Sequence, residues 1–177
     1  MLTKLGRWYN MSTLNVDTNQ DKGAAFEHAR LVQVVNTETG AVATGTTNAV
    51  ADNTIPQNTE GDEYMTLAIT PTNTNNKLLI QVVGNFAINA ADNLVMALFQ
   101  DSTANALAAV QWFNAGANHS QQINLNHFMT AGTTSSTTFK IRAGETGSNT
   151  VTFNGAGGTR VFGGNGSSSI TISEIRV

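Results

Sequence analysis

The side chains that most often carry catalysis are sparse in this sequence. None of its three histidines, His28, His119 and His127, lies at metal-ligand spacing from a second histidine or a carboxylate. No Gly-x-Ser-x-Gly elbow poises a serine beside a base, and the absence of cysteine excludes a thiolate nucleophile, a thiolate zinc site and a disulfide framework. His127 lies on an apolar strand face and is interpreted as a core or interface side chain, with a functional group as the alternative. We therefore expect a protein that is not an enzyme and that holds no cofactor or metal.

One group of acidic residues, Asp52, Glu60, Asp62 and Glu63, brings several oxygen donors together in the sequence. Calcium requires several such ligands, but the Asp-x-Asp-x-Asp-Gly order of a calcium loop is missing. A solvated loop that keeps an edge strand from pairing is the simpler interpretation. Weak calcium binding at these four residues stays open.

The glycine-rich segment 155–166 is similar to a phosphate-cradling loop in its glycine content alone. A strand pattern follows it in place of a helix, so no helix N-terminus would face an anion. We interpret the segment as tight turns at one end of a β-sandwich.

Aromatic residues near the N-terminus indicate a binding role. Residues 1–30 show no sustained helical or strand period, so Trp8 and Tyr9 have no local core to join. Trp, Tyr and Arg commonly dominate binding, and we predict that Lys4, Arg7, Trp8 and Tyr9 bind a partner, with folding back onto their own domain as the alternative. The pair 112–113, Trp-Phe, stands at a strand end and is interpreted as core in preference to a carbohydrate platform.

The rest of the chain alternates apolar with polar residues, which is the period of a strand. The pattern predicts about nine strands, at 31–35, 65–70, 77–84, 94–100, 105–112, 121–130, 137–143, 149–154 and 169–177. Short strands at regular spacing joined by Gly, Asn and Thr turns fit a sandwich or jelly roll. We predict an all-β protein with an extended arm at 1–30 and a jelly-roll β-sandwich of about eight to nine strands at 31–177.

The last segment, 169–177, is β-branched and keeps its strand pattern to the final residue. Free termini fray unless they are docked, so we expect this strand to be paired on both edges. Both of its faces carry apolar and polar groups, and several other strands are apolar on both faces, which favours burial against a neighbouring subunit. We predict that Ile170, Ile172, Glu174 and Arg176 lie at an oligomer interface.

The composition limits the classes of partner. Charged residues make up 12% of the chain, whereas 25 threonines, 21 asparagines and 10 serines supply neutral polar surface. Nine basic and twelve acidic residues give a net charge of −3 without a basic stripe, which argues against nucleic-acid binding. No apolar stretch is long enough for a membrane span, and the N-terminus lacks the apolar middle of a signal peptide. We expect synthesis in the cytosol and no membrane contact.

Three parts of the sequence resemble a diffuse group of short bacteriophage virion proteins, often labelled tail-fibre-like. These parts are residues 11–17, the strand 31–35 with the block 68–80, and residues 137–141 with 169–175. In that group a brief N-terminal segment precedes a jelly roll similar to the C1q and tumour-necrosis-factor knobs. The resemblance implies a homotrimer with its closing strand near the threefold axis, and a place on the outer surface of a virion after synthesis in the host cytoplasm. Because Glu174 and Arg176 lie on the same face of that strand as Ile170, we predict that they pair across the axis.

A short arm before the knob, in place of a long repetitive shaft, favours a capsid decoration or cement protein over a tail fibre. Its arm would bind the major capsid protein or another virion protein, and its jelly roll would project. The alternative is a tail-fibre or fibre-tip protein that recognises a host-surface glycan. A secreted C1q-like module is disfavoured because no export signal or collagen-like repeat is present.

Overall fold

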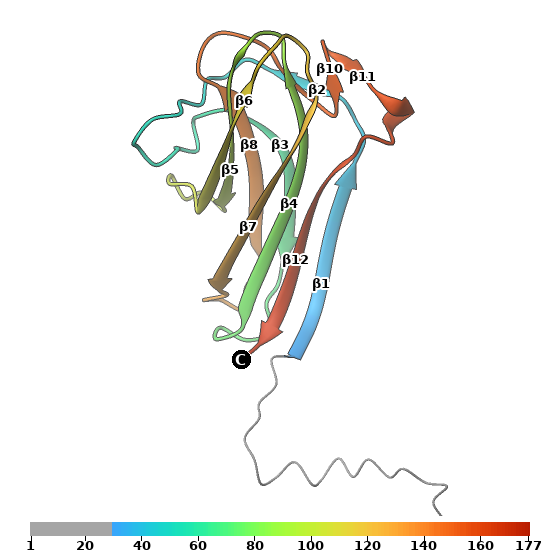
Figure 1. Cartoon of the computed structure of the whole chain (residues 1–177). Coiled ribbons are helices and arrows are strands. Elements are labelled where there is room, and N and C mark those ends of the chain that lie inside the picture. The colour runs from blue at the N-terminus through green and yellow to red at the C-terminus, as the bar shows by residue number, and fades with distance from the viewer. Residues whose placement is uncertain (1–29) are drawn as a thin grey trace, which may run out of the picture.

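The computed structural model describes residues 30–177, in which two antiparallel β-sheets pack face to face and two short strands form a third, separate sheet (Figure 1). A single 3-10 turn, η2 (Phe162–Gly164), interrupts the strands near the end of the described chain. The strands are β1 (Arg30–Thr39), β2 (Ala43–Gly45), β3 (Asp62–Ile69), β4 (Lys77–Ile88), β5 (Asp92–Gln100), β6 (Ala108–Asn114), β7 (Gln121–Thr130), β8 (Thr137–Glu145), β9 (Val151–Phe153), β10 (Gly155–Ala156), β11 (Thr159–Arg160) and β12 (Ser168–Arg176).

The strand order is that of a jelly roll. One sheet, here called the β4 sheet, has the order β1-β12-β4-β7, with β9 on the far part of β4 and β2 next to β9. The other, the β8 sheet, has the order β3-β8-β5-β6. The chain crosses between the two sheets after β2, β3, β4, β6, β7 and β8, and it stays in the β8 sheet for the β5–β6 hairpin. Eight long strands in two such sheets form the double Greek key, so the predicted all-β jelly-roll sandwich is confirmed.

The core follows from the two-residue period of the strands. Along β4, Leu78, Ile80, Val82 and Phe86 point into the sandwich and are almost completely buried. Strands of the β8 sheet supply the facing layer, including Leu94, Met96, Leu98, Phe139 and Ile141. Each such side chain contributes about 1.5–3 kcal/mol through its transfer out of water. Because only one face of each sheet is used for this core, the outer face of β4 remains at the surface.

All nine predicted strands exist, with some shifted boundaries. The segment at 105–112 begins later than expected, as β6 at Ala108, because Asn105 forms a bridge with Gln57 and Ala106 N–H donates to the Pro56 carbonyl. The first strand extends to Thr39, four residues beyond its predicted end at residue 35. The short β2, β10 and β11 have no period of their own and were not predicted.

The final strand lies between two partners, as predicted. β12 pairs with β1 along one edge and with β4 along the other, both antiparallel. It therefore ends at the same end of the sandwich at which β1 begins, the lower end in Figure 1.

Within residues 30–177, no helix is long and apolar enough to cross a membrane.

Candidate functional site: the open face of the β4 sheet

The outward-facing side chains of β1, β12, β4 and β7 form a surface that we call the open face. Strand register aligns these side chains in rows that cross all four strands. From β1 to β7, the rows are Leu31–Ile175–Lys77–Thr130, then Val34–Ser173–Leu79–Phe128, then Asn36–Thr171–Gln81–Asn126, and then Glu38–Ser169–Val83–Asn124. No element of residues 30–177 forms a further layer over this face (Figure 1).

The first two rows expose apolar side chains next to one another. Leu31 is 58% exposed, Val34 49% and Phe128 56%, and Leu79 and Ile175 between them are half-buried. Single exposed apolar residues are ordinary, whereas a contiguous group marks an interaction surface. These rows form an apolar band toward the lower end of the open face.

The third row is made of neutral polar side chains. The Asn36 amide donates to Thr171 Oγ1 at 2.8 Å and to the Ile170 carbonyl at 3.1 Å. Gln81 and Asn126 are exposed, and each amide can donate and accept hydrogen bonds. The four rows contain two charged residues: Lys77, whose Nζ lies 2.6 Å from Thr130 Oγ1, and Glu38, which accepts a hydrogen bond from Ser167. The open face is therefore nearly uncharged.

Three of the four predicted interface residues lie on the other side of β12. Ile170, Ile172 and Glu174 point into their own sandwich and have no exposed surface, so they have no contact area to offer a neighbouring subunit. The sequence alone left the strand's inner face ambiguous, because both of its faces carry isoleucine. Arg176 is exposed at the end of the same inner row and lies opposite Arg30.

Glu174 instead holds the β3–β4 turn against β12. Its carboxylate accepts hydrogen bonds from Asn76 Nδ2 at 2.6 Å, Gln33 Nε2 at 2.6 Å, and the backbone N–H and hydroxyl of Thr72 at 2.8 Å each. Burial raises the pKa of Glu174, but these hydrogen bonds outweigh burial and lower the pKa to about 2. The carboxylate is thus a buried anion solvated by neutral donors.

The predicted partner-binding residues Lys4, Arg7, Trp8 and Tyr9, and also His28, lie outside the described residues. His127 lies on the inner face of β7 and is partly buried, and burial lowers its pKa. His119 is exposed in a loop.

The Trp112–Phe113 pair divides between the two faces of β6. Trp112 packs against the core, as predicted. Phe113 is 57% exposed on the outer face of the β8 sheet, which corrects the prediction that both residues are core. Neighbouring residues of a strand point to opposite faces, so one of the two had to face outward.

The four carboxylates of the acidic group bind separate partners. Asp52 accepts hydrogen bonds from the N–H and hydroxyl of Thr54, and Asp62 does so from Thr47. Among residues 30–177 no set of three or more acidic, histidine or cysteine side chains is grouped as metal ligands.

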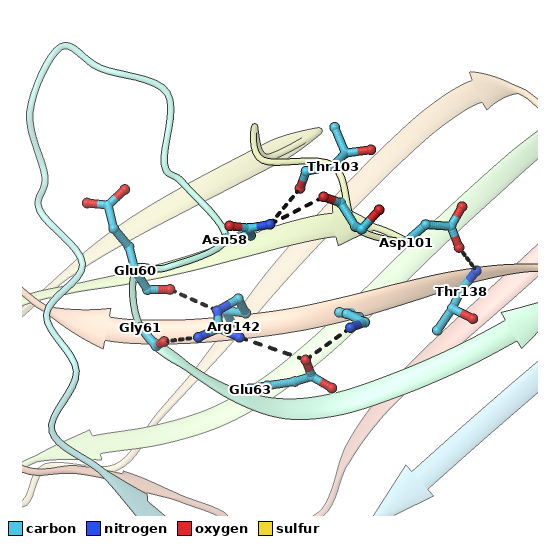
Figure 2. A network of polar contacts seen from close by, with 10 residues as sticks. Asn58, Glu60, Gly61, Glu63, Asp101, Thr103, Thr138 and Arg142 are labelled. Atoms are coloured by element: carbon cyan, nitrogen blue, oxygen red, sulfur yellow. Dashed lines mark hydrogen bonds and ion pairs between the residues drawn. The ribbon is translucent and has the colours of Figure 1, made fainter.

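The loop at 46–61, which carries Glu60, is attached to the β8 sheet by Arg142 and Asn58 (Figure 2). Glu60 accepts a hydrogen bond from the Gln57 N–H at 2.6 Å. Arg142 donates to the carbonyls of Glu60 and Gly61 at 3.0 and 2.6 Å, and its Nη1 lies 3.8 Å from the Glu63 carboxylate. Asn58 Nδ2 donates to the carbonyls of residues 102 and 103. The acidic group is therefore part of a structural network.

The glycine-rich segment forms turns at the upper end of the sandwich, as interpreted from the sequence. It contains the β10–β11 hairpin and η2, and Gly157, Gly158, Gly163 and Gly164 adopt positive φ. Phe162 at its tip is 80% exposed and also has a positive φ, of 50°, a conformation that is uncommon for a bulky residue.

Comparison with known proteins gives structural likenesses without a sequence relative. No protein-family model matches the chain, and no curated protein sequence matches it. The structure is similar to Eiger TNF from S. frugiperda, with a TM-score of 0.47, 8% identity, and coverage of 83% of this chain and 94% of that one. It is also similar to the sugar-binding EclA C-terminal domain, with a TM-score of 0.35, 12% identity, and coverage of 84% and 96%. A third likeness is to a protein of infectious bursal disease virus, Gx strain, with a TM-score of 0.36, 12% identity, and coverage of 82% and 40%. At these scores the likenesses carry no functional argument, and the fold assignment depends on strand order.

Proposed function

We propose that this protein is a non-enzymatic structural module that assembles through the open face into a homotrimer on the outside of a virion. The observation that supports assembly is the exposed apolar band across β1, β12, β4 and β7, on a face with almost no charge. The occupant that fits this face best is a second copy of the same chain, because a face with only two charged residues brings little like-charge repulsion when two copies of it meet.

The row pattern favours a cyclic contact whose axis runs along the strands over a pair whose twofold axis is perpendicular to them. In a ring whose axis follows the strands, the β1 edge of one copy meets the β7 edge of the next copy at the same height. Val34 then meets Phe128, and Asn36 meets Asn126, because each row runs level across all four strands. A twofold pair with its axis perpendicular to the strands reverses the heights and places apolar rows against amide rows. A closed cyclic contact thus matches apolar with apolar and amide with amide; the number three comes from the resemblance to phage virion proteins.

The face is large enough for this role. Four strands about 4.8 Å apart, each with about nine residues at about 3.3 Å, span roughly 19 by 30 Å. That projected area, about 600 Å², approaches the roughly 800 Å² that each partner buries in a standard interface.

Mass determination in solution tests the assembly. Full-length protein at micromolar concentration should sediment as a trimer, and Phe128→Asp should sediment as a monomer with an unchanged far-ultraviolet circular dichroism spectrum. Phe113→Asp is the matched control, because Phe113 is an equally exposed phenylalanine on the opposite sheet, and this variant should stay trimeric. A monomeric wild type, or a trimeric Phe128→Asp, would contradict the proposal.

The virion location is a separate step of the proposal. We place residues 1–30 on the shell, bound to the major capsid protein or another virion protein through Lys4, Arg7, Trp8 and Tyr9. Full-length protein should bind purified capsids, and the Trp8→Ala/Tyr9→Ala double variant should remain a trimer and lose that binding. Capsid binding that survives the double substitution would exclude these side chains as the anchor.

The second candidate function is recognition of a host-surface glycan by a fibre tip. It is favoured by Phe162, an exposed aromatic ring at the tip of the glycine-rich loop, since aromatic faces can pack against sugars. A glycan array on which wild type binds and Phe162→Ala does not would support this function. No binding on the array, together with hundreds of copies of this protein per virion, would favour the capsid decoration function.

A further inference from the structure

Two arginines face each other at the lower end of the sandwich. Arg30 and Arg176 are directly opposite in the β1–β12 register, which places their Cβ atoms about 5 Å apart. Like charges in directly opposite positions destabilise a strand pair. No carboxylate within residues 30–177 forms an ion pair with either guanidinium, since the ion pairs of this region join Glu63 to Lys140 and Arg142. No ion pair therefore neutralises these two positive charges in the described part of the protein.

The same two arginines line a cavity of about 400 Å³. Its other lining residues are Leu31, Val32, Thr72, Asn73 and Asn76, so the β3–β4 turn supplies the neutral polar part of the lining. The volume falls within the range of small-molecule sites, which begins at about 300 Å³. The cavity thus combines two cationic groups with neutral hydrogen-bonding groups.

Hydrogen bonds to the buried Glu174 carboxylate fix the β3–β4 turn that lines the cavity. Thr72 and Asn76 line the cavity, and both donate hydrogen bonds to the buried Glu174 carboxylate. Glu174 is two residues before Arg176 on the inner row of β12, and its oxygens accept hydrogen bonds from Thr72, Asn76 and Gln33. The sum of the two arginines and Glu174 remains positive, at +1.

The geometry points to an anion-binding site at the lower end of the sandwich, in which Arg30 and Arg176 together clamp one carboxylate or phosphate group. Guanidinium groups present paired N–H donors that match the oxygens of these anions, and charge-assisted hydrogen bonds are about twice as strong as neutral ones. Asn73 and the turn would contact the remainder of the ligand. Either an acidic sugar or a phosphorylated compound supplies the required group.

Binding is tested on the full-length protein with sodium glucuronate and with inorganic phosphate, in low-salt buffer, by calorimetric titration. We expect saturable binding of at least one probe with a dissociation constant near 1 mM, and the stronger probe identifies the source of the anion. Because a hydrogen bond to a charged group contributes about 1.5–3 kcal/mol, Arg30→Gln and Arg176→Gln should each weaken binding roughly 10- to 100-fold. Arg160→Gln is the matched control, since Arg160 is an exposed arginine of β11 at the other end, and it should bind like wild type.

Thermal unfolding is a second measurement, and it distinguishes an anion-binding Arg176 from one that only stabilises the fold. Without added anion, Arg176→Gln should melt at or above the wild-type temperature, because the like-charge pair is removed. Added probe should raise the melting temperature of wild type and leave that of Arg176→Gln unchanged. Absence of saturable binding up to about 20 mM of either probe, which is well above the expected dissociation constant, would overturn the inference. Equal loss of binding in Arg160→Gln would also overturn it.

Discussion

Removing the charge of Glu174 should make the protein less stable at neutral pH and less sensitive to acid than wild type over a defined pH range. The pKa of Glu174 is about 2 in the folded protein, against an ordinary value of 4.5. A carboxylate with a lowered pKa stabilises the folded state above its unfolded pKa, and this stabilisation is lost as the pH falls toward the folded pKa. The difference corresponds to about 3 kcal/mol, present at pH 7 and lost between roughly pH 5 and pH 2.

Glu174→Gln tests this value because it keeps the shape of the side chain and removes its charge. The new amide also turns donor hydrogens toward Asn76, Gln33 and Thr72, which are donors themselves. We expect the free energy of unfolding at pH 7 to fall by about 3 kcal/mol, a size typical for loss of a buried charged hydrogen-bonding group. The measurement is urea denaturation at fixed protein concentration, at intervals from pH 7 to pH 2.5, since association would shift the apparent stability.

The pH profile separates the lowered pKa from simple loss of packing. Wild type should lose stability over this range faster than Glu174→Gln, so that the two curves converge near pH 2.5. Glu63→Gln serves as the control, because Glu63 forms surface ion pairs, which contribute less than about 1 kcal/mol, and its curve should follow that of wild type. If the gap between wild type and Glu174→Gln stays constant from pH 7 to pH 2.5, the reasoning about the charge is refuted.

Three further substitutions test the core and the loop attachment by the same denaturation assay. Phe139→Ala empties a fully buried position between the sheets and should cost about 3–5 kcal/mol; a cost below about 1 kcal/mol would contradict the packing. Tyr64→Phe removes a buried hydroxyl that has no hydrogen-bond partner and should leave stability unchanged or raise it, whereas a clear loss would indicate a partner for that hydroxyl. Gly61→Ala places a Cβ 2.6 Å from the Ala143 carbonyl carbon at a φ of +63° and should destabilise by more than about 1 kcal/mol; a neutral result would mean that the loop moves freely there.

The two-residue period made the strands predictable, and it failed where both faces of a strand look alike. In β4 the pattern identified the strand, but it indicated burial on both faces, whereas Leu79 and Val83 lie on the open face. In β12 both faces carry isoleucine, and only the pairing with β1 and β4 shows that Ile172 is the one that faces the core. Periodicity describes one strand at a time, and which face is inside depends on the strands beside it.

The candidate sites were harder to predict because they depend on register between distant segments. Arg30 and Arg176 stand at opposite ends of the described chain and meet only through the β1–β12 pairing. For the acidic group, closeness in the sequence suggested a shared site that the structure does not form. Asp52 accepts its hydrogen bonds from Thr54, whereas Asp62 accepts its hydrogen bonds from Thr47. The level rows of the open face also require register across four strands, which no local pattern supplies.

The pairing of β1 has a consequence for the order of folding. Within residues 30–177, β12 is the only strand that pairs with β1, so β1 has no partner until residues 168–176 have left the ribosome. Until then the edge of β4 that will pair with β12 is also unpaired. The apolar residues Leu31, Val32 and Val34 meanwhile lie on a strand whose backbone groups have no partner strand. Such long-range pairing makes folding slow. The sheet that carries the open face is therefore completed last, and the assembly that we propose through that face would begin only after the whole jelly roll has been synthesised.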